Sequence, residues 1–366
     1  MKKVGLFIIC IIFGLVLLRG QFVVFAFDGE TGNRYVVYTE NNQYLFEKSS
    51  VEVGDSYISK DFKLYTIVEV DTQRKVATAQ FEKELKKPNI SVNPHRQKIE
   101  SGKDRKICLY LTHNDESYVP SDGYDSVYGA GGVHDVAKRI QDRFERVGVQ
   151  VWLDETLHIP HDTTAYNRSG VTANHLLKSY EPDAIFDIHR DGVGRSYYVT
   201  NVDGKERCKI RIVVGKANPN YEENLEFAMY LLSVAESDYP WLFSDIYMAK
   251  GHYNQGLYNK SLLFEMGTYL IEKELVLDSV EPLVDVVTTA LYSTTVDTDS
   301  GEILVGGEET PETPTINEHF NNIEIKKNND IVVSIIIIVI TFIVVGGGVW
   351  GTIYILNQNN SNRKGK

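Results

Sequence analysis

The sequence has few cysteines and no excess of positive charge. Its three cysteines, Cys10, Cys108 and Cys208, form neither a CxxC pair nor a regular framework, which excludes a disulfide scaffold and a thiolate metal site. Cys108 and Cys208 are interpreted as small packing residues. A net charge of -12 leaves no basic stripe that could neutralise phosphates, so we expect no nucleic acid partner.

The chain does have enough apolar side chains for a sizeable interior. Hydrophobic residues make up 43% of the 366 residues, and 22 tyrosines and 15 phenylalanines are among them. This composition excludes intrinsic disorder for most of the chain. The length predicts two folded domains, with further residues in tethers.

Two long apolar runs lie near the ends of the chain. The first, Val4 to Leu18, follows two lysines and predicts a signal anchor within residues 1–26; a cleaved signal peptide is the alternative, but no clear cleavage site follows. The second, Ile331 to Leu356, is uncharged over more than the roughly 20 residues that a bilayer requires. The sequence therefore predicts two transmembrane helices.

Flanking charges predict how these helices would be oriented. The tail over 357–366 is basic, so the positive-inside rule places both chain ends in the cytoplasm and the region between the two runs outside. An acidic segment rich in Pro and Thr, over 296–330, predicts an extended tether. We therefore expect a protein of the cytoplasmic membrane whose central region is extracytoplasmic and faces the cell wall.

The central region divides into two parts with different patterns. Residues 27–85 alternate over short stretches rich in Tyr, Val and Phe, which predicts a small all-β domain; it holds no cluster of chemical groups and is interpreted as a stalk or docking domain. A polar linker follows over 86–105. Strands and helices then alternate over 106–295, which predicts an α/β domain with a mostly parallel sheet flanked by helices.

Three predicted strands of this α/β domain end near residues that bind metals or transfer protons. His113 follows the strand over 106–112, with Glu116 just beyond; His189 ends the strand over 184–189, and Glu265 lies in the strand over 261–266. Functional groups of open α/β sheets collect at the carboxyl ends of strands. Two imidazoles and a carboxylate are the usual protein ligands of a catalytic zinc, and a further carboxylate is needed as general base. Asp187 shares a strand face with His189 and suits a supporting role.

These residues occur in longer strings that resemble a known family. YLTHNDESY, DIHRDG, IVVGKANPNYEENLEFA and YNQGLYNKSLLFEMG, with the pair His161 and Asp162, closely resemble the stage II sporulation protein P family, a branch of the zinc-dependent N-acetylmuramoyl-L-alanine amidases. The resemblance covers about residues 106–291. His113 and His189 match the family's essential histidines, and Glu265 matches its catalytic glutamate. The first family motif usually reads HTH, whereas this chain keeps only the second histidine.

The resemblance implies a zinc-dependent amidase and endopeptidase that acts on peptidoglycan. It further implies a role in septal wall thinning and forespore engulfment at the sporulation septum. The partners implied are peptidoglycan, the membrane, the lytic transglycosylase stage II sporulation protein D and a membrane scaffold. A vegetative or phage-type amidase and a catalytically idle wall-binding scaffold are the alternatives.

Several roles stay open at this stage. The third zinc ligand is Glu116 or His134, and Glu116 is favoured because related amidases use a carboxylate. The catalytic base is expected to be Glu265, with a buried salt bridge as its alternative role. Arg190 and Asp191 could orient the substrate or support the ligands, with a surface ion pair as the alternative. Asn254 and Gln255 could contact the substrate or pack their loop. His161 and Asp162 are further candidates for substrate contact or ligand support.

Overall fold

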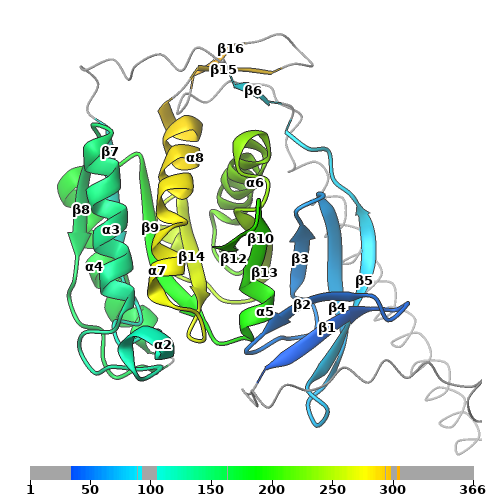
Figure 1. Cartoon of the computed structure of the whole chain (residues 1–366). Helices are drawn as coiled ribbons and strands as arrows, with labels where there is room; N and C mark the ends of the chain where they lie inside the picture. Colours follow the sequence, from blue (N-terminus) through cyan, green and yellow to red (C-terminus); the bar gives the residue numbers. More distant parts are fainter. Residues whose placement is uncertain are drawn as a thin grey trace, which may run out of the picture.

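The computed structural model describes residues 34–88, 90–92, 105–162, 164–292, 294–297 and 303–305. Its main feature is a single eleven-stranded sheet with the strand order β2-β1-β5-β4-β3-β13-β12-β14-β9-β7-β8 (Figure 1). Helices lie against both faces of the half that contains β7, β9 and β14. The fold is therefore mixed α/β, built on one large sheet.

The first five strands form what we call the N-terminal β unit. They are β1 Tyr35–Thr39, β2 Tyr44–Lys48, β3 Ser56–Ser59, β4 Lys63–Asp71 and β5 Val76–Glu84. Strand β3 pairs antiparallel with β13, Phe243–Ala249, and places Ile58 opposite Ile246. The fold class expected from the sequence is wrong in treating this region as a separate all-β domain, because its strands continue the sheet of the α/β part. Alternation along a strand reports which face is buried and carries no information on the partner at its edge.

Within the α/β part, four of the five strand pairings of the large sheet are parallel and one is antiparallel. Strands β8 Gln150–Asp154, β7 Lys106–Tyr110, β9 Ala184–Asp191 and β14 Ser261–Thr268 run parallel. Strand β12, Ile210–Gly215, runs antiparallel to β14 and parallel to β13. The sheet is mixed because β12 and β13 reverse direction. A strand buried on both faces shows the same apolar run in either direction, so its pattern does not reveal this reversal.

Two helical layers cover the α/β half of the sheet. Helices α3 Val133–Arg146, α6 Tyr221–Asp238 and α8 Val280–Tyr292 pack against one face, and α4 Ala165–Tyr180 packs against the other. In β7, Ile107 and Leu109 join the larger core with α3, α6 and α8, whereas Cys108 and Tyr110 join the smaller core with α4. This period of two assigns each strand residue to a face.

Short elements complete the described chain. They are β6 Ile90–Val92, α2 Val119–Asp122, α5 Arg195–Tyr198, β10 Val199–Val202, β11 Lys205–Cys208, η1 Gln255–Leu257, α7 Lys273–Leu277, β15 Thr294–Asp297 and β16 Ile303–Val305. Strands β10 and β11 form a hairpin, and β6, β15 and β16 form a three-stranded sheet. The loop after β7 and the strands β9 and β14 carry the central residues of the site described below.

The predicted transmembrane helices also require correction. Of the helices in the described residues, none is both long and apolar enough to cross a membrane. The two apolar runs from which they were predicted, over 4–18 and 331–356, lie outside the described residues, as does the predicted tether from residue 306 onward. The described fold class is therefore a mixed α/β sheet with flanking helices, without the two transmembrane helices that we expected.

Candidate metal centre

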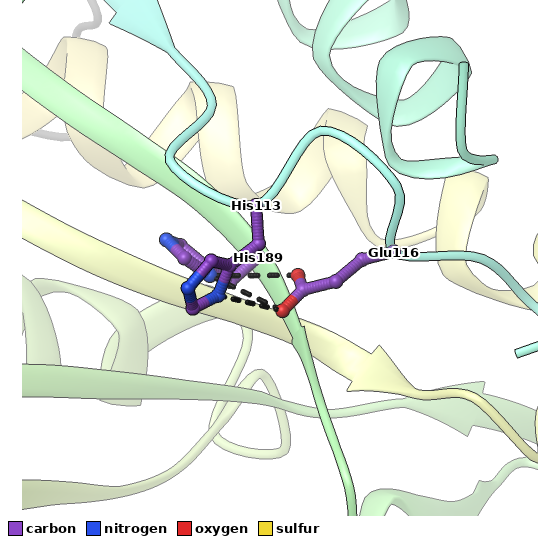
Figure 2. Close-up of side chains that lie close together, drawn as sticks. All are labelled: His113, Glu116 and His189. Carbon is purple, nitrogen blue, oxygen red and sulfur yellow. Dashed lines mark hydrogen bonds and ion pairs between the residues drawn. The ribbon is translucent and has the colours of Figure 1, made fainter. Parts of the chain in front are cut away.

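His113, Glu116 and His189 lie close together in the structure. Each offers one ligand atom, and these three atoms lie within 4.8 Å of one another (Figure 2). The Nδ1 atom of His113 is 3.2 Å from Oε1 of Glu116, and Nδ1 of His189 is 3.4 Å from the same oxygen. Two imidazole nitrogens and one carboxylate oxygen, largely enclosed by protein, are a donor set that suits a catalytic zinc.

The parallel pairing of β7 and β9 brings the two histidines to the same edge of the sheet. Tyr110 at the end of β7 pairs with Asp187 in β9, so both strands end on one side. The chain then turns after His113, where the Glu116 amide donates to the His113 carbonyl at 3.3 Å. Gly131 packs against this turn; a Cβ there would lie 2.1 Å from the Glu116 carbonyl oxygen. A residue without a side chain is therefore needed at this position.

The Asp187 carboxylate lies beside the His189 imidazole on the same face of β9. Oδ1 of Asp187 lies 3.0 Å from Nε2 of His189, although without hydrogen-bond alignment. The Asp187 carboxylate also accepts hydrogen bonds from the amide and hydroxyl of Thr112, at 2.9 and 2.6 Å. A carboxylate on one imidazole nitrogen leaves the other nitrogen free for a metal. In His189 that free atom is Nδ1, which faces Glu116.

His161 contacts the other histidine, and its neighbour Asp162 does not. The ring of His161 stacks on that of His113, with centroids 3.8 Å apart and an interplanar angle of 17°. Nδ1 of His161 lies 2.9 Å from Oδ1 of Asp115, which fixes the ring. Asp162 is exposed and pairs with Arg168 at 3.0 Å. The structure thus places His161 against the site and Asp162 on the surface.

Charges inside the cluster shift the pKa values of its members in opposite directions. Burial alone would raise the pKa of Glu116, but the neighbouring His189 and His113 hold it well below its ordinary value. Burial alone would lower the pKa of His189, but the carboxylates of Asp187 and Glu116 raise it well above its ordinary value. The metal-free protein therefore favours an ionised Glu116 beside a protonated His189. Metal binding needs the neutral imidazole and would release this proton.

Glu265 lies on the strand next to His189. The two residues are opposite each other in the pairing of β14 with β9. Oε1 of Glu265 accepts a hydrogen bond from the Lys48 ammonium at 2.7 Å, whereas Oε2 is buried and has no hydrogen-bond partner among the described residues. Burial raises the pKa of Glu265, and the positive charge of Lys48 opposes this shift. The carboxylate thus has one anchored oxygen and one that is available to accept a proton.

Arg190 and Asp191 do not pair with each other. The Arg190 amide donates to Oε2 of Glu116 at 2.9 Å, while its side chain donates to the carbonyls of Ser117 and Asp125 at 3.3 and 2.7 Å. Asp191 is buried and pairs with Lys48 and Arg211 at 3.1 and 3.0 Å. The surface ion pair that the sequence left open is therefore absent. Arg190 fixes Glu116 through its backbone.

Asn254 and Gln255 support the surroundings of the site. Nδ2 of Asn254 donates to the Ser169 hydroxyl at 2.9 Å, which lies 2.7 Å from the Thr112 hydroxyl beneath Asp187. The buried Gln255 accepts from the Gly215 amide at 2.7 Å and donates to the Val213 carbonyl at 2.8 Å. These contacts correspond to the loop-packing alternative for Gln255.

His134, the other candidate ligand, faces a different pocket. Its Nδ1 atom is 2.9 Å from Oε1 of Glu155, with which Lys138 also pairs. The three residues line this pocket together with Asp122, Asp135, Val127, Leu157 and the glycine-rich turn over 129–132. Within the described residues His134 belongs to no group of three metal-competent side chains. The geometry therefore favours Glu116 as the third ligand, although the ligand assignments themselves stay predictions.

Sequence reasoning missed three side chains around the site. The ring of Tyr166, at the start of α4, lies 5.5 Å from that of His113 and stacks near His189 at 6.2 Å. Lys48 and the fully buried Arg211 bind the acidic residues beside it. Arg211 carried a usable signal, since a charged residue inside the apolar strand IRIVVG must have a buried partner. No local signal marks Lys48.

Known amidases are among the solved structures that resemble the chain. An N-acetylmuramoyl-L-alanine amidase from Clostridium difficile 630 matches 52% of this chain and 98% of its own, with 14% identity and a TM-score of 0.34. The CwlD amidase from Clostridioides difficile, solved in complex with the GerS lipoprotein, matches 50% of this chain and 94% of its own, with 14% identity and a TM-score of 0.33.

A curated relative and a family model match by sequence. Stage II sporulation protein P from Bacillus subtilis (strain 168) is 27% identical over an alignment of 217 residues, and the match covers 54% of this chain and 54% of the relative. The chain thus spans about half the length of the curated relative it matches. The family model of stage II sporulation protein P matches residues 31–288, a stretch that includes the N-terminal β unit and the candidate metal centre. The chain belongs to the stage II sporulation protein P family.

Proposed function

We propose that this chain is a zinc-dependent peptidoglycan amidase that cleaves the bond between N-acetylmuramic acid and L-alanine. The observation that carries the proposal is the cluster of His113, Glu116 and His189 beside the buried Glu265. When bound by these three side chains, zinc would supply a Lewis acid that polarises the scissile carbonyl and makes water more acidic. Membership of the stage II sporulation protein P family supports the same activity.

The protein's own residues then have distinct tasks. Asp187, whose Oδ1 lies 3.0 Å from Nε2 of His189, would keep the proton of the neutral imidazole on Nε2 and leave the lone pair of Nδ1 for the metal. Glu265 takes a proton from the attacking water and later passes it to the departing amine. Its Oε2 atom suits this role, because no hydrogen bond from the described residues occupies it. Tyr166 and His161 pack against the histidine rings and restrict their movement.

The finer functional assignments are part of this proposal. We assign endopeptidase activity and a role in septal wall thinning and forespore engulfment, on the basis of the family resemblance. The proposed partners are peptidoglycan, the lytic transglycosylase stage II sporulation protein D and a membrane scaffold at the sporulation septum. Since peptidoglycan lies outside the cytoplasm, the domain would work there. Expression confined to sporulation would separate this role from that of a vegetative or phage-type amidase.

A digestion experiment tests the chemistry. The purified full chain is incubated with isolated peptidoglycan, and the released products are identified by mass spectrometry. We expect stem peptides with a free L-alanine amino group, lost on treatment with a chelator and restored by added zinc. Hydrolysis that survives the chelator would refute the metal assignment. Absence of any product under zinc would favour the idle wall-binding scaffold.

A further inference from the structure

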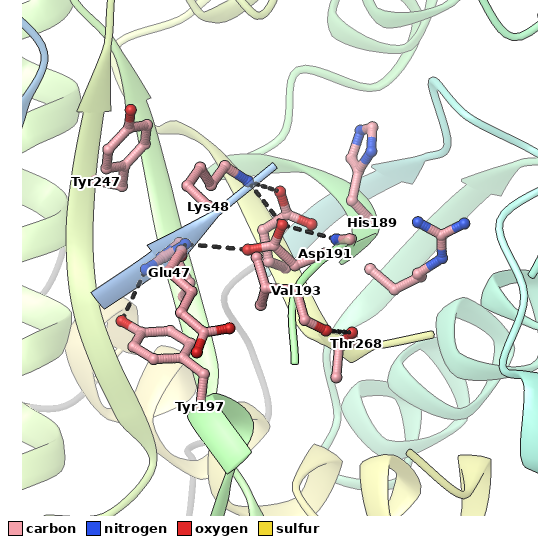
Figure 3. A network of polar contacts seen from close by, with 12 residues as sticks. Glu47, Lys48, His189, Asp191, Val193, Tyr197, Tyr247 and Thr268 are labelled. Carbon is pink, nitrogen blue, oxygen red and sulfur yellow. Dashed lines mark hydrogen bonds and ion pairs between the residues drawn. The ribbon is translucent and has the colours of Figure 1, made fainter. Parts of the chain in front are cut away.

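The Lys48 side chain reaches the candidate site from the N-terminal β unit. Lys48 is the last residue of β2, and its side chain is only 11% exposed. Its ammonium lies 2.7 Å from Oε1 of Glu265 and 3.1 Å from Oδ1 of Asp191, and Figure 3 shows it pointing from β2 toward Asp191. Lys48 and Glu265 are 217 positions apart in the sequence. The N-terminal β unit, in which the sequence showed no cluster of catalytic or metal-binding side chains, therefore supplies a cation to the site.

A buried arginine holds β2 in this position. Arg211 lies on β12, next to β14, and is fully enclosed. Its Nη1 atom donates to the Glu47 carbonyl at 2.8 Å and to Oδ2 of Asp191 at 3.0 Å, while its Nε atom donates to Asp245 at 2.8 Å. The Glu47 carbonyl immediately precedes Lys48. The backbone of Lys48 is thus tied to the α/β part by a charge-assisted hydrogen bond.

A second contact ties the same strand to the loop that follows β9. The Glu47 side chain accepts from the Gly194 amide at 3.1 Å and pairs with Arg34 at 3.2 Å. A Cβ at Gly194 would lie 2.6 Å from Nη1 of Arg34, so a side chain there would require the end of the Arg34 side chain to move. Because this loop continues the strand of His189, β2 is held directly beside the candidate metal centre.

The environment of Glu265 gives the Lys48 contact a specific consequence. A general base needs a carboxylate that is held still while one oxygen stays free to accept a proton. Lys48 donates to Oε1, and Oε2 has no hydrogen-bond partner among the described residues. Removing the Lys48 cation would leave Glu265 and Asp191 as enclosed carboxylates with less compensating charge. The Glu265 carboxylate would then turn or shift.

We propose that Lys48 is a positioning residue for Glu265, and that the N-terminal β unit is thereby part of the catalytic unit. The inference rests on the proposed amidase activity, in which Glu265 is the general base. Lys48 acts through the orientation of the Glu265 carboxylate and does not bind the metal. The unit thus does more than serve as a stalk or docking domain.

Steady-state kinetics of the full chain on purified peptidoglycan test this role. We expect Lys48→Met to lower kcat by at least about 10-fold with little change in KM, because misplacing a reacting group by about 1 Å costs up to ~100-fold. Lys48→Arg should restore part of the loss, and bound zinc should stay at the wild-type level. Lys75→Met is the matched control: Lys75 is a lysine of the same β unit that packs over Tyr35, with its Nζ 4.7 Å from the ring centroid. Wild-type kcat in Lys48→Met would overturn the proposal.

A double variant separates positioning from a general structural effect. If Lys48 acts through Glu265, Lys48→Met should change the residual hydrolysis of Glu265→Gln by less than about 2-fold. Effects that multiply in the double variant would show that Lys48 acts independently of Glu265, and the proposal would be wrong. If circular dichroism shows Lys48→Met to be misfolded, Lys48→Gln replaces it in the same experiments.

Denaturant unfolding of the wild type, Lys48→Met, Glu265→Gln and the double variant tests the contact without any substrate. We expect Lys48→Met to shift the unfolding midpoint less in the Glu265→Gln background than in the wild type, because the two side chains interact. Equal shifts in both backgrounds would refute the pairing. A wild-type chain that releases nothing from peptidoglycan would refute the proposed function, and the unfolding cycle would still decide on the Lys48–Glu265 contact.

Discussion

Oδ1 of Asp187 lies 3.0 Å from Nε2 of His189, two residues further along the same strand. Strand geometry places alternate side chains on one face, so the carboxylate sits directly beneath the imidazole. The same carboxylate accepts two hydrogen bonds from Thr112, at the start of the loop that carries His113. One buried carboxylate therefore links the two segments that supply the candidate metal ligands.

This relationship predicts the effect of replacing Asp187. Asp187→Asn should weaken zinc binding by about 10- to 100-fold, because the carboxylate orients the ligating imidazole and raises its basicity. The dissociation constant is measured by competition with a chromogenic chelator. Asp183→Asn is the matched control, since Asp183 accepts a hydrogen bond from the Lys106 amide at 2.9 Å, as Asp187 does from Thr112. Equal affinities in the two variants would contradict the assigned role.

Replacing the proposed general base should separate catalysis from metal binding. In Glu265→Gln we expect hydrolysis of peptidoglycan to fall by at least about 100-fold while zinc remains bound, since a general base contributes roughly 10²- to 10⁴-fold. Product release and zinc content are measured on the same preparation. Glu206→Gln, which alters an exposed partner of Arg195, should leave hydrolysis unchanged. Joint loss of zinc and activity would make Glu265 a ligand.

The third ligand can be identified from bound metal alone. Glu116→Ala should lose most of its zinc, because a three-ligand site depends on each ligand for geometry and charge balance. His134→Ala should keep its zinc, since His134 faces Glu155 in a separate pocket. Elemental analysis is made on variants that circular dichroism shows to be folded. The opposite pattern, with zinc lost only in His134→Ala, would reverse the assignment.

Lys209, which lies outside the metal centre, should make the stability of the protein depend on pH. Burial, together with the nearby charge of Arg211, lowers the pKa of Lys209 from 10.5 to about 8 in the folded protein. Between these values the unfolded chain binds the proton and the folded chain does not, so this group makes the free energy of unfolding rise with pH from about 8 to 10.5. Below pH 8 the folded protein carries the full cost of the buried charge.

Lys209→Met should remove that cost. We expect the variant to be more stable than the wild type at pH 7, and the difference to shrink as the pH rises toward 10. Denaturant midpoints of both proteins at the two pH values measure this change, and other titrating groups contribute equally to both. A stability difference that does not vary with pH would show that the Lys209 charge is not penalised in the fold.

Much of the α/β half follows from local patterns. The strand expected over 106–112 is β7, Lys106–Tyr110, and the helix expected over 133–147 is α3, Val133–Arg146. Periods of 2 and 3.6 residues arise from backbone geometry, so they are visible without knowledge of neighbouring elements. Strand β13 and helix α8 were not foreseen. Helix α8 is buried along most of its length, and a segment enclosed on many sides shows little periodicity.

By itself the sequence determined which residues end the central strands and therefore which could meet. His113, His189 and Glu265 follow or end apolar strand runs, and parallel strands carry their ends to one edge of the sheet. Only the tertiary structure decided the direction of β12, the joining of β3 to β13 and the contact of Lys48 with Glu265. The physical reason is the distance along the sequence over which each interaction acts. The burial of a face leaves a local periodic trace, whereas edge pairing and enclosed ion pairs depend on segments that are remote along the chain and meet only when it folds.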